Sequence, residues 1–310
     1  MEKDYEEVRR LEEALLDAKG EIDYTFLNDY MFRSILQKSN RVLKALVCVL
    51  LKLSPEEVTS VEITNPIELG KSIDDKKFIL DIKVKINNAD LLNLEMQLIN
   101  YKDWPERSLQ YLCRTYDSLL SGEDYINTKK AIHIGFLDFT LFEDHPEFIG
   151  TYRLYNANDH HLYTDKFEMR YVDMTRLDLA TDKDSGVTKW VKLFKAKTWE
   201  EMKMIAEKDA DMLEATENLY TSNSDQTARD IAFHRQLVMQ REKAREKELA
   251  DLAWHNQMAM QREKAREQAR IEKERLEEER KLCLAQEMNN ELETAENRPF
   301  VFEEEETFFA

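Results

Sequence analysis

Cysteine, glycine and proline are scarce in this chain, which holds three, six and five of them among 310 residues. The cysteines (Cys48, Cys113 and Cys283) lie far apart and form no CxxC pair, so neither a disulfide framework nor a zinc knuckle is expected. Glycine-rich phosphate loops and the GxSxG elbow are also missing from the sequence. These absences argue against ATP-driven and serine-hydrolase chemistry, and they favour a reducing compartment.

Long apolar runs are lacking as well. The most apolar stretch, "VLKALVCVLLKL" (42–53), is interrupted by Lys44 and is shorter than the ~18 residues of a membrane span. The first twenty residues are charged and contain no apolar run, so a signal peptide is not expected. We therefore expect a cytoplasmic protein with no membrane partner.

Positive charge is in short supply: 45 Lys and Arg face 63 Asp and Glu, and the formal net charge is −18. Such a balance opposes general binding to polyanions, because the mean field of the protein repels them. Any role on nucleic acid would need local positive charge or metal ions. The hydrophobic content of 42% is nevertheless ample for a core in one or two domains.

Residues 21–185 alternate between helical and strand periodicity, in the order α-β-β-β-α-β-β-β, which predicts a mixed α/β domain with flanking helices. Asn28 or Asp29 could cap the first helix, Pro105 suits the first turn of the later helix, and Gly122 suits its end. Helices are expected over 23–53 and 104–122, a hairpin over 78–98, and further strands over 58–69, 129–142, 148–156 and 166–174.

From Gly186 onward the pattern is helical, and it contains an internal repeat. "HRQLVMQREKARE" (234–246) returns as "HNQMAMQREKARE" (255–267), an offset of three heptads. We expect a helical lead-in (1–20), the mixed α/β domain (21–185), a helical subdomain (186–232), a charged repeat helix (233–292) and an acidic tail (293–310).

The repeat helix admits two interpretations. Its heptad phase favours coiled-coil association, and we expect a weak homodimer through the C-terminal helix. Its apolar seam is thin, with Leu237 and Met258 separated by smaller or polar residues, so a single solvated helix stabilised by charge pairs is the alternative.

The hairpin "FILDIKVKINNADLLNLEMQL" carries acids where plain core strands need none. Residues two apart on a strand share a face, so Asp81 lies on the face opposite the apolar residues, as do Glu95 and Gln97 on the second strand. A turn around Asn87–Asp90 puts Asp81 roughly opposite Glu95. Two carboxylates there either repel or share a divalent cation. A solvated polar face balanced by Lys83 and Lys85 is the plainer interpretation.

These residues resemble a known family. "NDYMF", "ILDIKVK", "NLEMQ", "LLSGEDY", "AIHIGFLDFTLF" and a later Trp-containing helix resemble, in this order, the Rpn family of recombination-promoting nucleases and transposases, within the PD-(D/E)xK nuclease superfamily. The resemblance covers roughly residues 21–250. It implies a restriction-endonuclease-like fold, α/β with a mixed sheet flanked by helices, followed by an extended helical C-terminal region.

The resemblance also implies roles for residues. Asp81 and Glu95 would bind the metal, Mg²⁺ or Mn²⁺, and Asp29 would complete the site. Gln97 stands where many members of the superfamily have Lys and would orient the attacking water. Leu80 stands where the superfamily has Pro, a departure from the pattern.

The helix after the hairpin supplies a candidate DNA-binding face, because Arg107, Tyr111 and Arg114 follow one another at helical spacing. A plain surface face of the helix is the alternative. We therefore expect a Mg²⁺-dependent DNA endonuclease. The rival is a weak or inactive nuclease-fold protein that acts as an interaction module through its charged repeat.

Overall fold

The computed structural model describes residues 10, 13–66, 81–119 and 122–296, with side chains described up to residue 286. The chain divides into two compact units, 1–244 and 245–310, and each is described by itself. None of the described helices is both long and apolar enough to cross a membrane.

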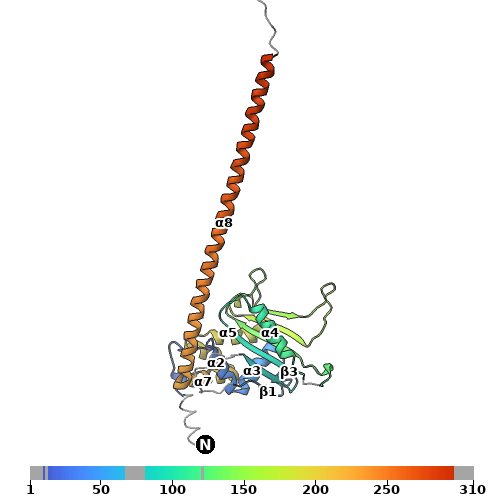
Figure 1. The fold of residues 1–310 in the computed structure, drawn as a ribbon. Helices are drawn as coiled ribbons and strands as arrows, with labels where there is room; N and C mark the ends of the chain where they lie inside the picture. Colours follow the sequence, from blue (N-terminus) through green and yellow to red (C-terminus); the bar gives the residue numbers. More distant parts are fainter. Residues whose placement is uncertain (1–9, 11–12, 67–80, 120–121, 297–310) are drawn as a thin grey trace, which may run out of the picture. The chain divides into compact units, whose positions relative to one another are not determined.

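A six-stranded mixed sheet forms the centre of the first unit, in the order β1-β2-β3-β4-β6-β5 (Figure 1). The antiparallel pairs are β1/β2, β2/β3 and β5/β6, while β3/β4 and β4/β6 are parallel. The strands are β1 (Val61–Ile63), β2 (Ile82–Ile86), β3 (Asp90–Gln97), β4 (Ala131–Leu137), β5 (Ile149–Arg153) and β6 (Phe167–Asp173).

Helices surround this sheet and continue beyond it. The first helices are α2 (Asp29–Lys38) and α3 (Asn40–Leu51), and α4 (Trp104–Tyr116) joins the parallel strands β3 and β4. The later helices are α5 (Ser185–Lys195), α6 (Trp199–Ala206), α7 (Ala210–Ser224) and α8 (Gln226–Glu296), with 3₁₀ turns at Tyr125–Asn127, Leu177–Leu179 and Asp182–Asp184. The predicted element order and the mixed α/β fold with a long C-terminal helix are confirmed.

The two faces of the sheet are covered differently. The apolar side chains of β2, β3 and β4 join the main core together with α2, α3 and α5. The other face lies against α4, which contacts β3, β4 and β6 (Figure 1). A small second cluster of Trp104, Leu137 and Tyr171 forms there. Gly135 permits this packing, because a Cβ at that position would lie 2.1 Å from the Trp104 ring.

Local signals explain several boundaries. The Asn28 side chain caps α2 by accepting a hydrogen bond from the Met31 N–H at 3.3 Å, so Asn28 rather than Asp29 is the cap. Asn87 and Asn88 both adopt positive φ angles, which suits the tight turn between β2 and β3.

Three boundaries differ from the expected ones. Helix α4 ends at Tyr116 rather than near Gly122, because the Ser118 N–H bonds the Tyr116 carbonyl in a tight turn at 2.9 Å. Strand β1 is shorter than 58–69, whose last three residues lie outside the described residues. Residues 78–80 of the predicted hairpin also lie outside them. Of the lead-in, residues 13–17 are helical.

Helix α8 belongs to both units. Its first part packs into the first unit, where the Asn28 side chain donates to the Ala232 carbonyl at 2.9 Å and the Tyr101 hydroxyl donates to Glu242 at 2.6 Å. In the second unit, charge pairs such as Arg270–Glu267 and Arg275–Glu272 run along the helix. Such pairs are present in both interpretations of the repeat helix, so its association with a second chain stays a prediction. The expected domain boundaries stay a prediction.

Candidate active site

Asp81 and Glu95 meet on the α4 face of the sheet. Asp81 directly precedes β2, and the register of the hairpin pairs Ile82 with Leu94, so one step further along puts Asp81 across from Glu95. The alternation of β3 turns Leu94 into the main core and Glu95 toward α4. The two acids therefore lie close enough for the charge of Asp81 to act on the pKa of Glu95.

The main chain of Asp81 is firmly held while its carboxylate is not. Its carbonyl accepts hydrogen bonds from the guanidinium of Arg33 on α2 and from the Asn65 amide at 3.0 Å. The residue is 3% exposed, and neither carboxylate oxygen has a hydrogen-bond partner among the described residues. Burial raises the pKa of Asp81.

Glu95 is held through one of its two oxygens. Arg107 on α4 donates to Oε1 at 2.5 Å, while Oε2 has no hydrogen-bond partner among the described residues. Burial raises the pKa of Glu95 to about 7, against the opposing effect of the Arg107 guanidinium. The sheet and α4 thus bury a carboxylate that changes its charge near neutral pH.

His133 on β4 lies beside Glu95 and was not singled out from the sequence. Its ring is fully buried, its Nε2 lies 3.9 Å from Glu95 Oε2, and its Nδ1 lies 3.0 Å from the Asn93 amide nitrogen. Burial lowers its pKa to about 3, so the imidazole is neutral. A polar residue inside the apolar strand "AIHIGFL" was the available signal.

The other two predicted site residues have local partners. Gln97 shares the α4 face two residues beyond Glu95, and its amide donates to the Ile99 carbonyl at 2.8 Å. Asp29 forms a bidentate ion pair with Arg235 of α8, whose Nη2 lies 2.5 Å from Oδ2. The structure therefore brings Asp81 and Glu95 together, with Gln97 on the same face, and it gives Asp29 a partner from α8.

The three residues expected to bind DNA line one hollow of about 340 Å³ along α4. Arg107 connects this hollow to Glu95, and its guanidinium lies 5.7 Å from the centre of the Tyr111 ring. Asp103 and Glu106 line the hollow too, so its two arginines are matched by two acids. The hollow supplies donors for a phosphate but no net positive charge.

The donor set fits a magnesium ion held by two carboxylates. Three buried carboxylate oxygens, two on Asp81 and one on Glu95, lack partners among the described residues, and carboxylate oxygens are the ligands that Mg²⁺ prefers. Within the described part of the chain, no group of three or more His, Cys, Asp or Glu residues could hold a metal ion. Waters and substrate phosphate would complete such a coordination shell.

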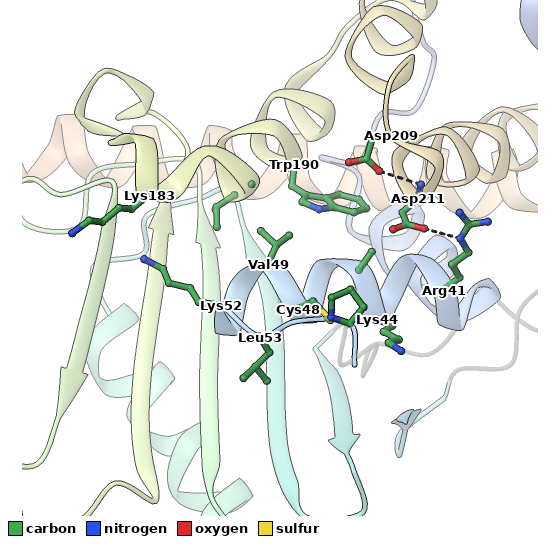
Figure 2. A pocket seen from close by; sticks show the side chains of 14 residues that line it. Arg41, Lys44, Cys48, Val49, Lys52, Leu53, Lys183, Trp190, Asp209 and Asp211 are labelled. Atoms are coloured by element: carbon green, nitrogen blue, oxygen red, sulfur yellow. Dashed lines mark hydrogen bonds and ion pairs between the residues drawn. The ribbon is translucent and has the colours of Figure 1, made fainter. Parts of the chain in front are cut away.

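A different hollow of about 610 Å³ lies away from these acids, between α3, α5 and the start of α7 (Figure 2). Trp190 and Val49 form apolar parts of its lining, and Arg41 at its edge donates to Asp211 at 2.6 Å. Neither Asp81 nor Glu95 lines it. This hollow is therefore separate from the candidate active site.

Comparison with known protein families gives a match, and the matched region contains the acidic hairpin. The model of the PD-(D/E)XK nuclease family transposases matches residues 26–250, which include both acids, α4, His133 and the first part of α8. Searches of curated proteins and of solved structures gave no match. Because the match spans most of the chain, the protein belongs to the PD-(D/E)XK nuclease family of transposases.

Proposed function

We propose that this protein is a Mg²⁺-dependent DNA endonuclease that hydrolyses phosphodiester bonds and is related to the recombination-promoting nucleases. Membership of a nuclease family supports the reaction class. The observation that carries the proposal is the pair of buried acids, Asp81 and Glu95, which the register puts across from each other and of which three carboxylate oxygens have no hydrogen-bond partner among the described residues. Buried carboxylates without partners are costly, and a cation would satisfy them.

Asp81 and Glu95 would hold the ion, Mg²⁺ or Mn²⁺. The metal would polarise the phosphodiester and lower the pKa of the attacking water. Gln97 would orient that water by turning its amide away from Ile99. Asp29 is proposed as a further acid of the site, which requires release from Arg235.

Arg107 has two possible partners in this scheme. In the structure it neutralises Glu95, and its side chain is about one-third exposed (34%) toward the hollow on α4. Once Glu95 turns to a cation, the guanidinium is available to a phosphate of DNA beside Tyr111 and Arg114. Because the net charge of −18 repels DNA, binding should be weak without metal and steeply dependent on salt.

Plasmid nicking in Mg²⁺ and in EDTA tests the proposal. Wild type should nick only in Mg²⁺, and Asp81→Asn and Glu95→Gln should each abolish nicking while remaining folded. Glu62→Gln is the matched control, because Glu62 is an exposed carboxylate on the neighbouring strand β1 and should not affect nicking. Nicking by either site variant at the wild-type rate would contradict the assignment.

A second candidate function is an interaction module with a weak or inactive site. Two observations favour it: Asp81 and Glu95 are only 3% and 5% exposed, and Arg107 already occupies Glu95. The charged repeat helix would then carry the function. Folded wild type that neither binds Mn²⁺ nor nicks DNA, yet associates through residues 245–310, would favour this candidate over the nuclease.

Location and assembly belong to the same proposal. We place the protein in the cytoplasm, which agrees with the free thiols of its three cysteines. We also propose a weak homodimer through the C-terminal helix. The exposed apolar residues of its second unit, among them Leu249, Leu252 and Trp254, support this association.

A further inference from the structure

The imidazole of His133 on β4 is held in one orientation by residues from two elements, β3 and α4. On the α4 face the parallel register places His133 beside Asn93, and Gly135 beside Glu95. Two rings of α4 cover the imidazole: Tyr111 stacks on it with an interplanar angle of 9° and a centroid distance of 6.0 Å, and Trp104 lies at 5.6 Å. A fully buried ring between these neighbours has little freedom to turn.

Trp104 reaches this position only because of Gly135. A Cβ on residue 135 would lie 2.1 Å from the indole, and so any side chain there would push Trp104 off the sheet. The strand "AIHIGFL" therefore supplies both the imidazole and the gap that lets Trp104 cover it. Neither feature is needed by the main core, which lies on the opposite face of the sheet.

The hydrogen bond from Asn93 sets the position of the proton on His133. The amide nitrogen of Asn93 donates to Nδ1 at 3.0 Å, so Nδ1 is an acceptor and a neutral ring carries its proton on Nε2. This Nε2–H faces Glu95 Oε2 across 3.9 Å. Neither atom has a hydrogen-bond partner among the described residues.

The gap is about 1 Å longer than a hydrogen bond of ordinary length. A small rotation of the Glu95 side chain, once its Oε1 leaves Arg107, would close it. A neutral Nε2–H can then donate to the ionised carboxylate, and Oε1 remains available to a ligand. The same contact would be weaker for a Glu95 that stayed paired with Arg107.

We propose that His133, oriented by Asn93, is a positioning residue that fixes Glu95 for cation binding by donating Nε2–H to Oε2. The inference rests on the proposed function, because it assigns a partner to a residue that the proposed function makes a metal ligand. His133 is not itself a ligand in this arrangement, since its Nδ1 is occupied by Asn93. Buried hydrogen-bond partners of metal ligands typically change metal affinity about 10–100-fold.

The first test is the tautomer of His133 in the metal-free protein. The ¹⁵N chemical shifts of a histidine ring distinguish a proton on Nε2 from one on Nδ1. We expect the Nε2–H form in wild type and a mixture of forms in Asn93→Ala. A proton on Nδ1 in wild type would overturn the inference, because Nε2 could then no longer donate to Glu95.

The second test is Mn²⁺ affinity measured by calorimetry on the full chain. We expect His133→Phe to lower the affinity at least about tenfold, and His133→Gln, which keeps a donor amide, to recover part of the loss. Ile132→Val is the control: it trims a buried residue on the same strand but on the core face, so it should lower stability without lowering affinity.

Three outcomes separate this inference from the proposed function. If wild type binds no Mn²⁺, the metal site fails and this inference fails with it. If Glu95→Gln abolishes binding while a folded His133→Phe binds like wild type, the metal site stands and the role of His133 is refuted. If both variants lose affinity and Ile132→Val does not, both proposals are supported.

Discussion

The two faces of strands β3 and β4 are both buried, but one buries apolar side chains and the other buries polar ones. On one face Leu94 and Phe136 pack into the apolar core. On the other face Glu95 and His133 are buried as deeply, yet each keeps an atom without a hydrogen-bond partner among the described residues. An unsatisfied buried polar group costs about 1–3 kcal/mol. A face built this way costs stability, which agrees with the metal site that we propose there.

Leu94 and Glu95 are adjacent in the sequence but lie on opposite faces, so substituting each in turn tests the difference between the faces. Leu94→Ala should lower the free energy of unfolding by about 2–5 kcal/mol, because it leaves a cavity in the core, and DNA nicking by the protein that remains folded should persist. Glu95→Gln should abolish nicking without lowering the free energy of unfolding at neutral pH, because the amide keeps the volume of the side chain and removes a carboxyl group whose pKa is raised by burial. Urea unfolding and the nicking assay measure both quantities. If Leu94→Ala and Glu95→Gln lowered the free energy of unfolding equally, the two faces would not differ in what they contribute to stability.

The pH dependence of stability should differ in sign between two variants of the polar face. The pKa of Glu95 is raised from 4.5 to about 7, so folded protein keeps a proton that the unfolded chain releases, and stability falls as pH rises through this interval. The pKa of His133 is lowered from 6.5 to about 3, so the unfolded chain binds a proton that the folded protein does not, and stability falls as pH drops. The two effects oppose each other between about pH 4.5 and 6.5.

A variant that lacks one of the two titrating groups should show the pH dependence of stability that the other group causes. Relative to wild type, Glu95→Gln should become more stable as pH rises from 4.5 to 7, and His133→Gln should become more stable as pH falls from 6.5 to 3. The slope for one proton is about 1.4 kcal/mol per pH unit. Urea unfolding of the metal-free proteins at several pH values measures it. Parallel slopes for the two variants would contradict the opposed assignment.

Gly135→Ala should disturb the packing of α4 on the polar face of the sheet and leave the packing of the core face unchanged. The added methyl group lies 2.1 Å from the Trp104 ring, so α4 must shift, at a cost of about 1–3 kcal/mol. The shift carries Arg107 and Tyr111 away from Glu95 and His133, and nicking should fall. Gly122→Ala is the control for a glycine-to-alanine change that has no neighbour within 4 Å, although its positive φ adds local strain. Unchanged Trp104 packing in a crystal structure of Gly135→Ala would refute the prediction.

The smallest effect is expected from the far part of α8. A chain that ends at Ala244 keeps the contacts of Arg235 and Glu242 with the first unit, and it should retain nicking and lose self-association. Sedimentation across a range of concentrations measures the association. If the shortened and full-length chains both remain monomers throughout, the repeat is not an oligomerisation element.

The sequence predicted what short-range patterns determine. Alternation along the hairpin placed Leu94 and Glu95 on opposite faces and put Asp81 across from Glu95, and the structure has that register. The plainer interpretation of a solvated polar face is wrong, because Asn93, Glu95 and Gln97 are buried under α4. Periodicity shows which residues share a face, but it does not show what covers that face.

Contacts between segments that are distant in the chain could not be predicted from the sequence. The pairs Arg107–Glu95, Asn93–His133 and Asp29–Arg235 depend on where α4, β4 and α8 pack, which only the assembled fold decides. Arg107 was predicted to bind phosphate, and its helical position was right, but its partner in the structure is a carboxylate. Lys83 and Lys85, expected to balance the acids, form no ion pair with Asp81 or Glu95 among the described residues.

The position of Trp104 also makes the polar face visible to spectroscopy. Among the four tryptophans, Trp190 and Trp199 are buried in the main core and Trp254 is exposed on the second unit, so Trp104 is the one that lies beside His133. A rearrangement of α4 over the sheet would change the surroundings of this indole alone. A chain in which the other three are replaced by Phe would therefore report the state of the site through its own fluorescence, without any added label.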